Sequence, residues 1–216
     1  MKLRKLQRGF TLIEIAIVLL IIGLLLGGVM KGQSMINSAR VRSLANDLTG
    51  IEAAWISFQD RYRSLPGDYG QASTHILDGA ANGDANARVD DGETGAVWQH
   101  LSAAGFIGGS YDGTAVAVNT TDCATTTCPS NPFNGFYKIS NSANALDSNV
   151  AAHELSTGGN IPAEVMYELD LKMDDGIANT GRLRAFDGAG ADCVAGGEWN
   201  VVGGSADCAG VLRLPL

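Results

Sequence analysis

The feature that most constrains this chain is an apolar run near its N-terminus that holds a single charged residue. From Phe10 to Met30 there are 21 residues, and the charge among them is that of Glu14. At 1.5 Å per residue, a helix over this run is about 30 Å long, which matches the hydrocarbon core of a bilayer. The run therefore predicts a transmembrane helix over residues 10–30.

The residues before the run are basic, and they predict its orientation. The first nine residues contain no acid and four positive charges, which are Lys2, Arg4, Lys5 and Arg8. Because basic flanks stay in the cytoplasm, we expect the rest of the chain to be exported. A cleavable secretory signal would have a shorter apolar core and a small-residue site such as Ala-x-Ala after it. An ordinary signal anchor explains every feature of the run except Glu14.

Glu14 needs an explanation because a carboxylate in a membrane helix costs on the order of 3 kcal/mol, and less near the interface. One explanation is that Glu14 lies shallow enough to reach the interface or to take up a proton. The other is that Glu14 has a charged partner inside the apolar layer.

The stretch RGFTLIE, which ends at Glu14, resembles the class III signal of type IV pilins and of the related pseudopilins. The resemblance implies that residues 1–9 are a leader, which a prepilin peptidase removes by cutting between Gly9 and Phe10. It also implies that the same enzyme methylates the new amino group of Phe10. In such filaments Glu14 would pair with the terminal amine of a neighbouring subunit during assembly.

The helical pattern continues through residues 31–65. Apolar side chains recur there at spacings of three and four, which predicts an amphipathic helix; they are Met35, Ile36, Ala39, Val41, Leu44, Leu48, Ile51, Ala54, Trp55 and Phe58. Pro66 and Gly67 form a stop signal. A helix from Phe10 to about Tyr62 would be about 80 Å long and needs partners. We expect identical helices to cover its first half and a globular head to cover its second half.

Four glycines lie close together in the first half of the predicted helix, and two hypotheses account for them. They are Gly23, Gly27, Gly28 and Gly32, and each lowers helix stability by about 1 kcal/mol relative to alanine. They either let the helix stretch locally in a filament or allow close packing between helices through small residues.

Residues 66–216 read as one globular head. Glycine makes up 28 of the 216 residues, and most of it lies in this part among Asn, Asp, Ser and Thr, which favours turns and short strands. We expect helices over 93–104 and 161–173, with Pro162 in the first turn of the latter. The predicted strands are 115–119, 136–139, 183–186, 199–202 and 211–214. The expected fold is α+β, with an antiparallel sheet packed on the distal half of the long helix.

The four cysteines all lie in the head, at positions 123, 128, 193 and 208. Their spacings fit neither a zinc ribbon nor a redox C-x-x-C motif, and an even number beyond a membrane segment indicates disulfides in an oxidising compartment. Three pairings are open from the sequence alone. The simplest joins sequence neighbours, Cys123 with Cys128 and Cys193 with Cys208.

Two acidic segments are weak candidates for calcium binding. Asp84 and Asn86 begin a loop rich in oxygen ligands, although Arg88 stands where another such ligand would be needed. Asp174 and Asp175 follow a predicted helix, where their charges oppose the helix dipole. A polar loop and an acidic turn are the simpler explanations of these two segments, so we expect no cofactor, and calcium is the one alternative.

The chain is not expected to be an enzyme. Its three histidines are scattered, and the sequence contains no zinc-protease, serine-hydrolase or phosphate-loop motif. Beyond the basic leader, eleven basic residues face 23 acidic ones, which argues against nucleic acid as the main partner.

The resemblance therefore predicts a structural subunit of a type IV pilus, serving adhesion, motility or DNA uptake. The first alternative is a type II secretion pseudopilin, and the second is a signal-anchored periplasmic binding protein. The expected partners are identical or related pilin subunits, prepilin peptidase and an inner-membrane assembly platform. Before assembly the helix would lie in the bacterial inner membrane with the head in the periplasm. The subunit would then move to the cell surface or to a periplasmic pseudopilus.

Overall fold

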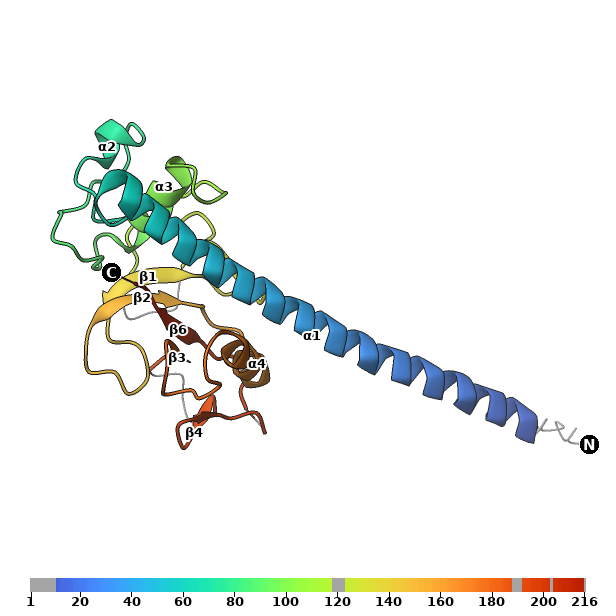
Figure 1. Cartoon of the computed structure of the whole chain (residues 1–216). Coiled ribbons are helices and arrows are strands. Elements are labelled where there is room, and N and C mark those ends of the chain that lie inside the picture. The colour runs from blue at the N-terminus through green and yellow to red at the C-terminus, as the bar shows by residue number, and fades with distance from the viewer. Residues whose placement is uncertain (1–10, 118–122, 188–191, 203, 216) are drawn as a thin grey trace, which may run out of the picture. The chain divides into compact units, whose positions relative to one another are not determined.

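The long helix predicted from the sequence is present. The computed structural model describes residues 11–117, 123–187, 192–202 and 204–215, and helix α1 covers Leu12–Tyr62 (Figure 1). It ends where Arg63 enters the left-handed region with φ 54°, while its N–H still donates to the carbonyl of Gln59 at 2.9 Å. A left-handed residue directly after the last turn is a common helix stop, so the helix ends at Tyr62, four residues before Pro66.

The chain divides into two compact units, residues 1–39 and Arg40–Leu216. In the described part of the first unit, the helix is unbroken through the four glycines, and a Cβ built on any of them meets no atom within 4 Å. The second unit contains the rest of α1 and the head, which share one core.

The core of the second unit forms around one face of α1. Its buried side chains are spaced three or four apart, as the sequence pattern predicted; they are Val41, Leu44, Ala45, Leu48, Ile51, Ala54, Trp55 and Phe58. They pack in one hydrophobic cluster with sheet residues such as Ile139, Leu155 and Leu212. Fully burying an aliphatic or aromatic side chain contributes about 1.5–3 kcal/mol, so this face contributes much of the stability of the unit.

An antiparallel sheet packs on this helix, and the fold is α+β as predicted. Strands β1 (Lys138–Ser142), β2 (Ala152–Ser156), β6 (Gly210–Arg213) and β3 (Leu183–Ala185) lie side by side in that order (Figure 1). All three pairings are antiparallel. Since β6 lies between β2 and β3, the C-terminal strand is an inner strand of the sheet.

A second, two-stranded sheet consists of β4 (Val194–Ala195) and β5 (Glu198–Trp199). The two central residues of its turn, Gly196 and Gly197, have φ values of 64° and 90°. A tight hairpin of this kind requires positive φ at its central residues, which glycine adopts without steric cost.

Three further helices lie in the described part of this unit. They are α2 (Ala72–His75), α3 (Thr94–Ala103) and α4 (Ala163–Met173). The predictions of α3 and α4 are confirmed, and α2 was not predicted. Pro162 is extended, with ψ 142°, and stands at the N-cap of α4 instead of in its first turn.

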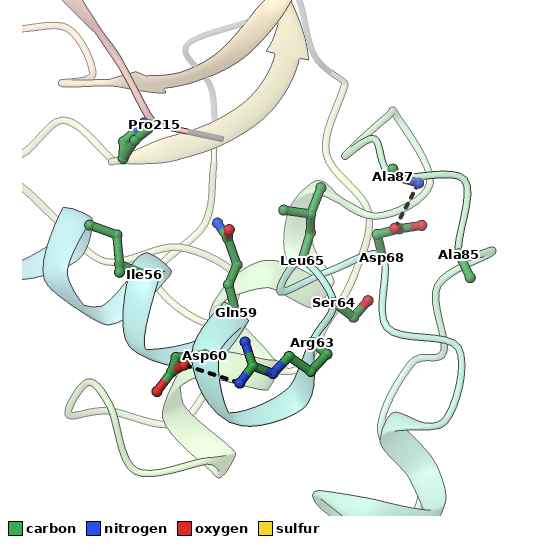
Figure 2. A pocket seen from close by; sticks show the side chains of 10 residues that line it. All are labelled: Ile56, Gln59, Asp60, Arg63, Ser64, Leu65, Asp68, Ala85, Ala87 and Pro215. Carbon is green, nitrogen blue, oxygen red and sulfur yellow. Dashed lines mark hydrogen bonds and ion pairs between the residues drawn. The ribbon is translucent and has the colours of Figure 1, made fainter.

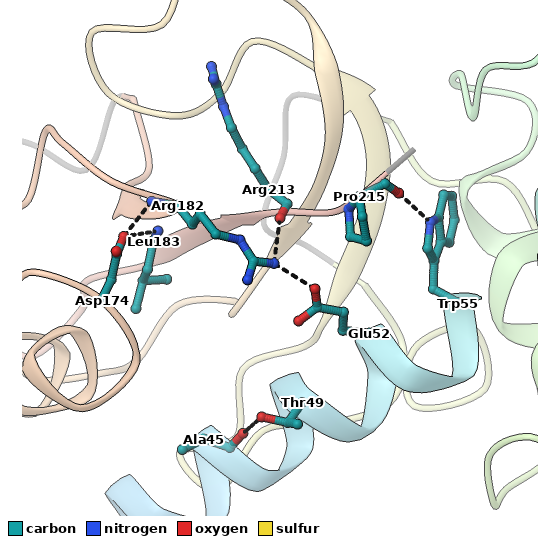
Figure 3. A network of polar contacts seen from close by, with 9 residues as sticks. All are labelled: Ala45, Thr49, Glu52, Trp55, Asp174, Arg182, Leu183, Arg213 and Pro215. Carbon is teal, nitrogen blue, oxygen red and sulfur yellow. Dashed lines mark hydrogen bonds and ion pairs between the residues drawn. The ribbon is translucent and has the colours of Figure 1, made fainter. Parts of the chain in front are cut away.

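Hydrogen bonds tie the C-terminal end of the sheet to α1 (Figure 3). The guanidinium of Arg182 donates to Glu52 on α1 at 2.6 Å and to the carbonyl of Arg213 at 3.2 Å. The indole N–H of Trp55 donates to the carbonyl of Pro215 at 3.2 Å. Trp55 is buried, so its indole N–H cannot reach water, and this hydrogen bond gives it the acceptor that it would otherwise lack.

The predicted strands at 183–186 and 211–214 are confirmed within a residue, but the prediction at 115–119 is wrong over its described part. Residues 115–117 form no strand, because Val116 exchanges its backbone hydrogen bonds with the hydroxyl of Thr94 instead. Residues 118 and 119 lie outside the described residues.

Two other predicted strands are present, but with different bounds. In the segment 136–139 the strand begins only at Lys138, and Phe136 forms an isolated bridge with Ser130. In the segment 199–202 the strand ends at Trp199, because the N–H of Val201 turns back to the carbonyl of Trp199 at 3.0 Å. Strand β2 was missed because its sequence, AHELS, places a buried glutamate where an apolar residue would be expected.

Candidate functional site

Glu14 lies in the first turn of α1 and forms a reciprocal contact with Thr11. The N–H of Glu14 donates to the hydroxyl of Thr11 at 3.3 Å, and the N–H of Thr11 donates to the carboxylate of Glu14 at 3.5 Å. This is the geometry of a capping box, for which T-x-x-E before an apolar run is the sequence signal. The sequence predictions missed this motif. The contact holds the carboxylate of Glu14 at the N-terminal end of the helix.

Phe10 directly precedes Thr11 in the chain. The predicted cleavage site, Gly9 and Phe10, lies outside the described residues, as does the basic leader. A new amine on Phe10 would be one residue away from the group that Glu14 already contacts. A carboxylate near the first turn of a helix is also favoured by the helix dipole.

The segment that follows Glu14 presents an apolar surface. From Leu12 to Met30, the large hydrophobic side chains are between 46% and 93% exposed. Within the described residues, α1 is the helix that is long and apolar enough to cross a membrane. An exposed apolar surface of this extent is typical of a segment that lies in lipid or packs against other apolar helices. It suits membrane anchoring before assembly.

The cysteines form two disulfides between sequence neighbours, Cys123 with Cys128 and Cys193 with Cys208. The second encloses the β4–β5 hairpin. Cys208 also exchanges backbone hydrogen bonds with Ile161, at 2.8 and 3.3 Å, and so joins the hairpin to the start of α4. These bridges stabilise the head and leave no thiol free among the described residues.

The first calcium candidate gains two carboxylates in the structure. Oxygens of Asp68, Asp84 and Glu93 lie within 4.8 Å of one another, and Asp68 and Glu93 are only 3% and 5% exposed. The side-chain amide of Asn86 donates to Asp84 at 2.8 Å, so Asn86 provides a donor to this cluster. Burial raises the pKa of Asp68 and of Glu93, and neighbouring carboxylates raise both further.

The acids missing from the sequence prediction had no shared local signal. Asp68 follows the helix stop at Pro66 and Gly67, whereas Glu93 directly precedes α3. The fold brings them together because the segment after Gly83 runs back along the segment after α1. Figure 2 shows Asp68 with its carboxylate bonded to the N–H of Ala87, at 2.9 Å.

The second calcium candidate is a separate cluster, in which Asp174 and Asp175 join Asp170. Asp170 is fully buried and accepts a hydrogen bond from the indole of Trp199 at 2.8 Å. Burial raises its pKa to about 6. Asp175 accepts hydrogen bonds from Thr180 and from the N–H of Ile177, which lower its pKa.

Asp174 joins the two ends of the loop between α4 and β3. Its carboxylate accepts the N–H of Arg182 and, at 3.0 Å, that of Leu183 (Figure 3). The charge of Arg184 also acts on Asp175. The two exposed carboxylates of this cluster are therefore already held by donors from the loop that follows them.

The buried histidines do not form a common site. His100 accepts the N–H of Gly67 at 2.9 Å and contacts the carbonyl of Ala81 at 2.6 Å, so a neutral ring satisfies both groups. His153 lies beside Trp55, with ring centroids 5.3 Å apart. Burial lowers the pKa of both rings. Their surroundings are those of core side chains.

Comparison with known proteins gives a match for the N-terminal segment. No curated protein and no solved structure matches the chain. Residues 4–30 match the family model described as the prokaryotic N-terminal methylation motif. That range includes Gly9, Phe10 and Glu14, and it ends with the apolar segment. Residues 4–30 thus carry the class III prepilin signal of type IV pilins and pseudopilins, and this signal supports a pilin-like or pseudopilin precursor.

Proposed function

We propose that this protein is a structural subunit of a type IV pilus-like filament, which serves adhesion, motility or DNA uptake. Prepilin peptidase cuts between Gly9 and Phe10 and methylates Phe10, and the mature chain polymerises through its N-terminal helix. The observation that carries this proposal is Glu14, the single acid in an exposed apolar segment that begins with the methylation motif.

Assembly follows from the electrostatics of that segment. Two opposite charges 4 Å apart attract by about 1 kcal/mol in water and about 4 kcal/mol at an effective dielectric constant of 20. Packing of apolar helices removes water around Glu14 and strengthens its attraction to the methylated amine of a neighbouring subunit. The capping contact with Thr11 keeps the carboxylate at the end of the helix where that amine would arrive.

The partners follow from the same steps. Before assembly, the apolar segment lies in the inner membrane with the head in the periplasm, and an assembly platform in that membrane extracts it. In the filament, identical or related subunits replace lipid around the exposed side chains of residues 12–30. The two disulfides suit a head that is exported to an oxidising compartment.

Processing can be tested by intact-mass spectrometry of the protein purified from its native host. We expect loss of Met1–Gly9 and a gain of about 14 Da from one methyl group. An uncleaved mass would contradict the proposal and leave a signal-anchored periplasmic protein.

Assembly can be tested with Glu14→Gln, which keeps the shape of the side chain and removes its charge. We expect normal cleavage and little or no filament, while the exposed α4 acid in Glu164→Gln provides a control that assembles normally. Normal filament yield from Glu14→Gln would refute charge pairing.

The same processing also serves a type II secretion pseudopilus, and deletion of the gene distinguishes the two machines. Loss of surface filaments, with secretion of folded proteins unchanged, agrees with a pilus. Loss of secretion without loss of surface filaments would assign the subunit to a pseudopilus.

A further inference from the structure

The carboxylates of Asp68, Asp84 and Glu93 meet where two loops run along each other. The N–H of Gly83 donates to the carbonyl of Tyr69 at 3.1 Å, and that of Ala85 donates to the carbonyl of Asp68 at 3.2 Å. A Cβ at Gly83 would lie 2.3 Å from the backbone of Asp68, so only glycine allows this approach. The close contact holds the acids together despite their charges.

One oxygen of this cluster lacks a partner. The Oε1 atom of Glu93 accepts the N–H of Asp84 at 2.8 Å, whereas Oε2 is buried and has no hydrogen-bond partner. Leaving a buried charged acceptor unsatisfied costs more than losing an ordinary hydrogen bond. Because Oε1 accepts the N–H of Asp84, the Glu93 carboxylate, which also carries the unpartnered Oε2, lies against Asp84.

The charges around Glu93 do not offset its own. The charged groups that act on it are the carboxylates of Asp68, Asp84 and Asp90. Asp84 in turn acts on Asp68. Arg88, in the same loop, is exposed. Like charges at buried positions such as those of Asp68 and Glu93 are stable only when they bind protons or a cation.

We propose that Asp68, Asp84 and Glu93 bind a calcium ion. Three carboxylates whose oxygens lie within 4.8 Å of one another provide the hard oxygen ligands that calcium prefers. Backbone N–H groups fix Asp68, with hydrogen bonds of 2.8 and 2.9 Å from Asn86 and Ala87. Calcium accepts such irregular arrangements, whereas magnesium demands near-ideal octahedral geometry.

Solvent reaches the cluster from one side. Asp84 is exposed, which leaves room for water to complete the coordination of the ion. Asp68, Ala85 and Ala87 also line an open groove with a volume of about 700 Å³ (Figure 2). The ion would thus join the loop after α1 to the start of α3, and it would order the loop between them.

The proposal can be tested with the full chain in detergent, treated with EDTA and then titrated with CaCl2 or MgCl2 by calorimetry. We expect one calcium ion per chain, a Kd of about 10⁻⁴–10⁻³ M as in extracellular modules, and a higher melting temperature in CaCl2. Absence of calcium binding overturns the proposal, and equally tight magnesium binding overturns the assignment to calcium.

Variants locate the site. Asp84→Asn changes an exposed side chain, so the protein should fold, and we expect calcium affinity to fall about ten-fold or more. Asp78→Asn, an exposed acid outside the cluster, is the control and should bind calcium normally. If Asp84→Asn binds normally, or if Asp175→Asn removes binding instead, the proposed site is wrong.

Glu93→Gln separates ion binding from a purely structural role. Gln keeps the acceptor for Asp84 and removes the buried charge. We therefore expect this variant to melt at or above the wild-type temperature in EDTA and to gain no stability from CaCl2. Stabilisation of Glu93→Gln by CaCl2 to the wild-type extent contradicts the proposal.

Discussion

Asp170 is a fully buried acid on α4, and its replacement by asparagine should change how stability depends on pH. Burial raises the pKa of Asp170 from 3.8 to about 6, and the charges of Asp174 and Asp175 act in the same direction. The hydrogen bond from the indole of Trp199, at 2.8 Å, acts in the opposite direction but does not compensate for burial. One oxygen of Asp170 has no hydrogen-bond partner.

The sign of the effect follows from linkage between folding and protonation. Below pH 4 Asp170 carries a proton in both the folded and the unfolded state, so it does not disfavour folding. Between pH 4 and 6 the folded state keeps a proton that the unfolded state releases, and the free energy of unfolding falls as pH rises. Above pH 6 the decrease in the free energy of unfolding is complete. It amounts to about 3 kcal/mol, because the pKa rises from 3.8 to about 6 and each pKa unit corresponds to about 1.4 kcal/mol.

Asp170→Asn should remove this dependence. The asparagine carbonyl can still accept the Trp199 indole N–H, and its amide can donate toward the neighbouring carboxylates. We expect the variant to match the wild type near pH 4 and to exceed it by up to about 3 kcal/mol at pH 7.

The assay is urea unfolding of the full chain in detergent and EDTA, at several pH values between 4 and 7.5. Other buried carboxyls titrate as well, so the difference between variant and wild type is the quantity to compare. Glu168→Gln, an exposed α4 acid, should show no such trend. A difference that is independent of pH, or a variant that is less stable at pH 7, would refute the reasoning.

Two further predictions concern the second unit. Leu48→Ala should lower the free energy of unfolding by about 2–5 kcal/mol, because Leu48 is fully buried in the core; Ile56→Ala, at a half-exposed position on the same helix, should cost far less in the same denaturant titration. Serine substitution of Cys193 and Cys208 should cost about 3 kcal/mol, and that of Cys123 and Cys128 about 2 kcal/mol, because the closed loops differ in length, 15 against 5 residues. Equal losses from both pairs would contradict the chain-entropy explanation.

Much of the helical structure was predictable because its signals are local. The apolar period between Val41 and Phe58 repeats over several turns, and it indicated both the helix and its buried face. Helices α3 and α4 carry the same kind of pattern. Strands β3 and β6 were also found, since short apolar runs there stand between turn residues.

The missed elements depend on partners far along the chain. Strand β2 contains Glu154, which is buried because it accepts the hydroxyl of Ser142 and the N–H groups of Asn144 and Ala145. The sequence AHELS gives no indication of those donors, which lie outside it. Val116 shows the converse, since its segment has strand propensity but hydrogen-bonds with Thr94.

The order of residues along the chain was sufficient to predict a membrane-length helix and its processing signal, because both depend on residues within one continuous segment. The grouping of Asp68 with Asp84 and Glu93 required the tertiary structure. Asp170 and Asp174 are four residues apart at the end of one helix and are therefore neighbours by local geometry, but the burial of Asp170 required the tertiary structure. Both groups bring together acids whose environment is set by burial and by neighbouring backbone N–H groups. Burial and through-space charge interactions arise only when the chain folds, so they leave no periodic or local trace in the sequence.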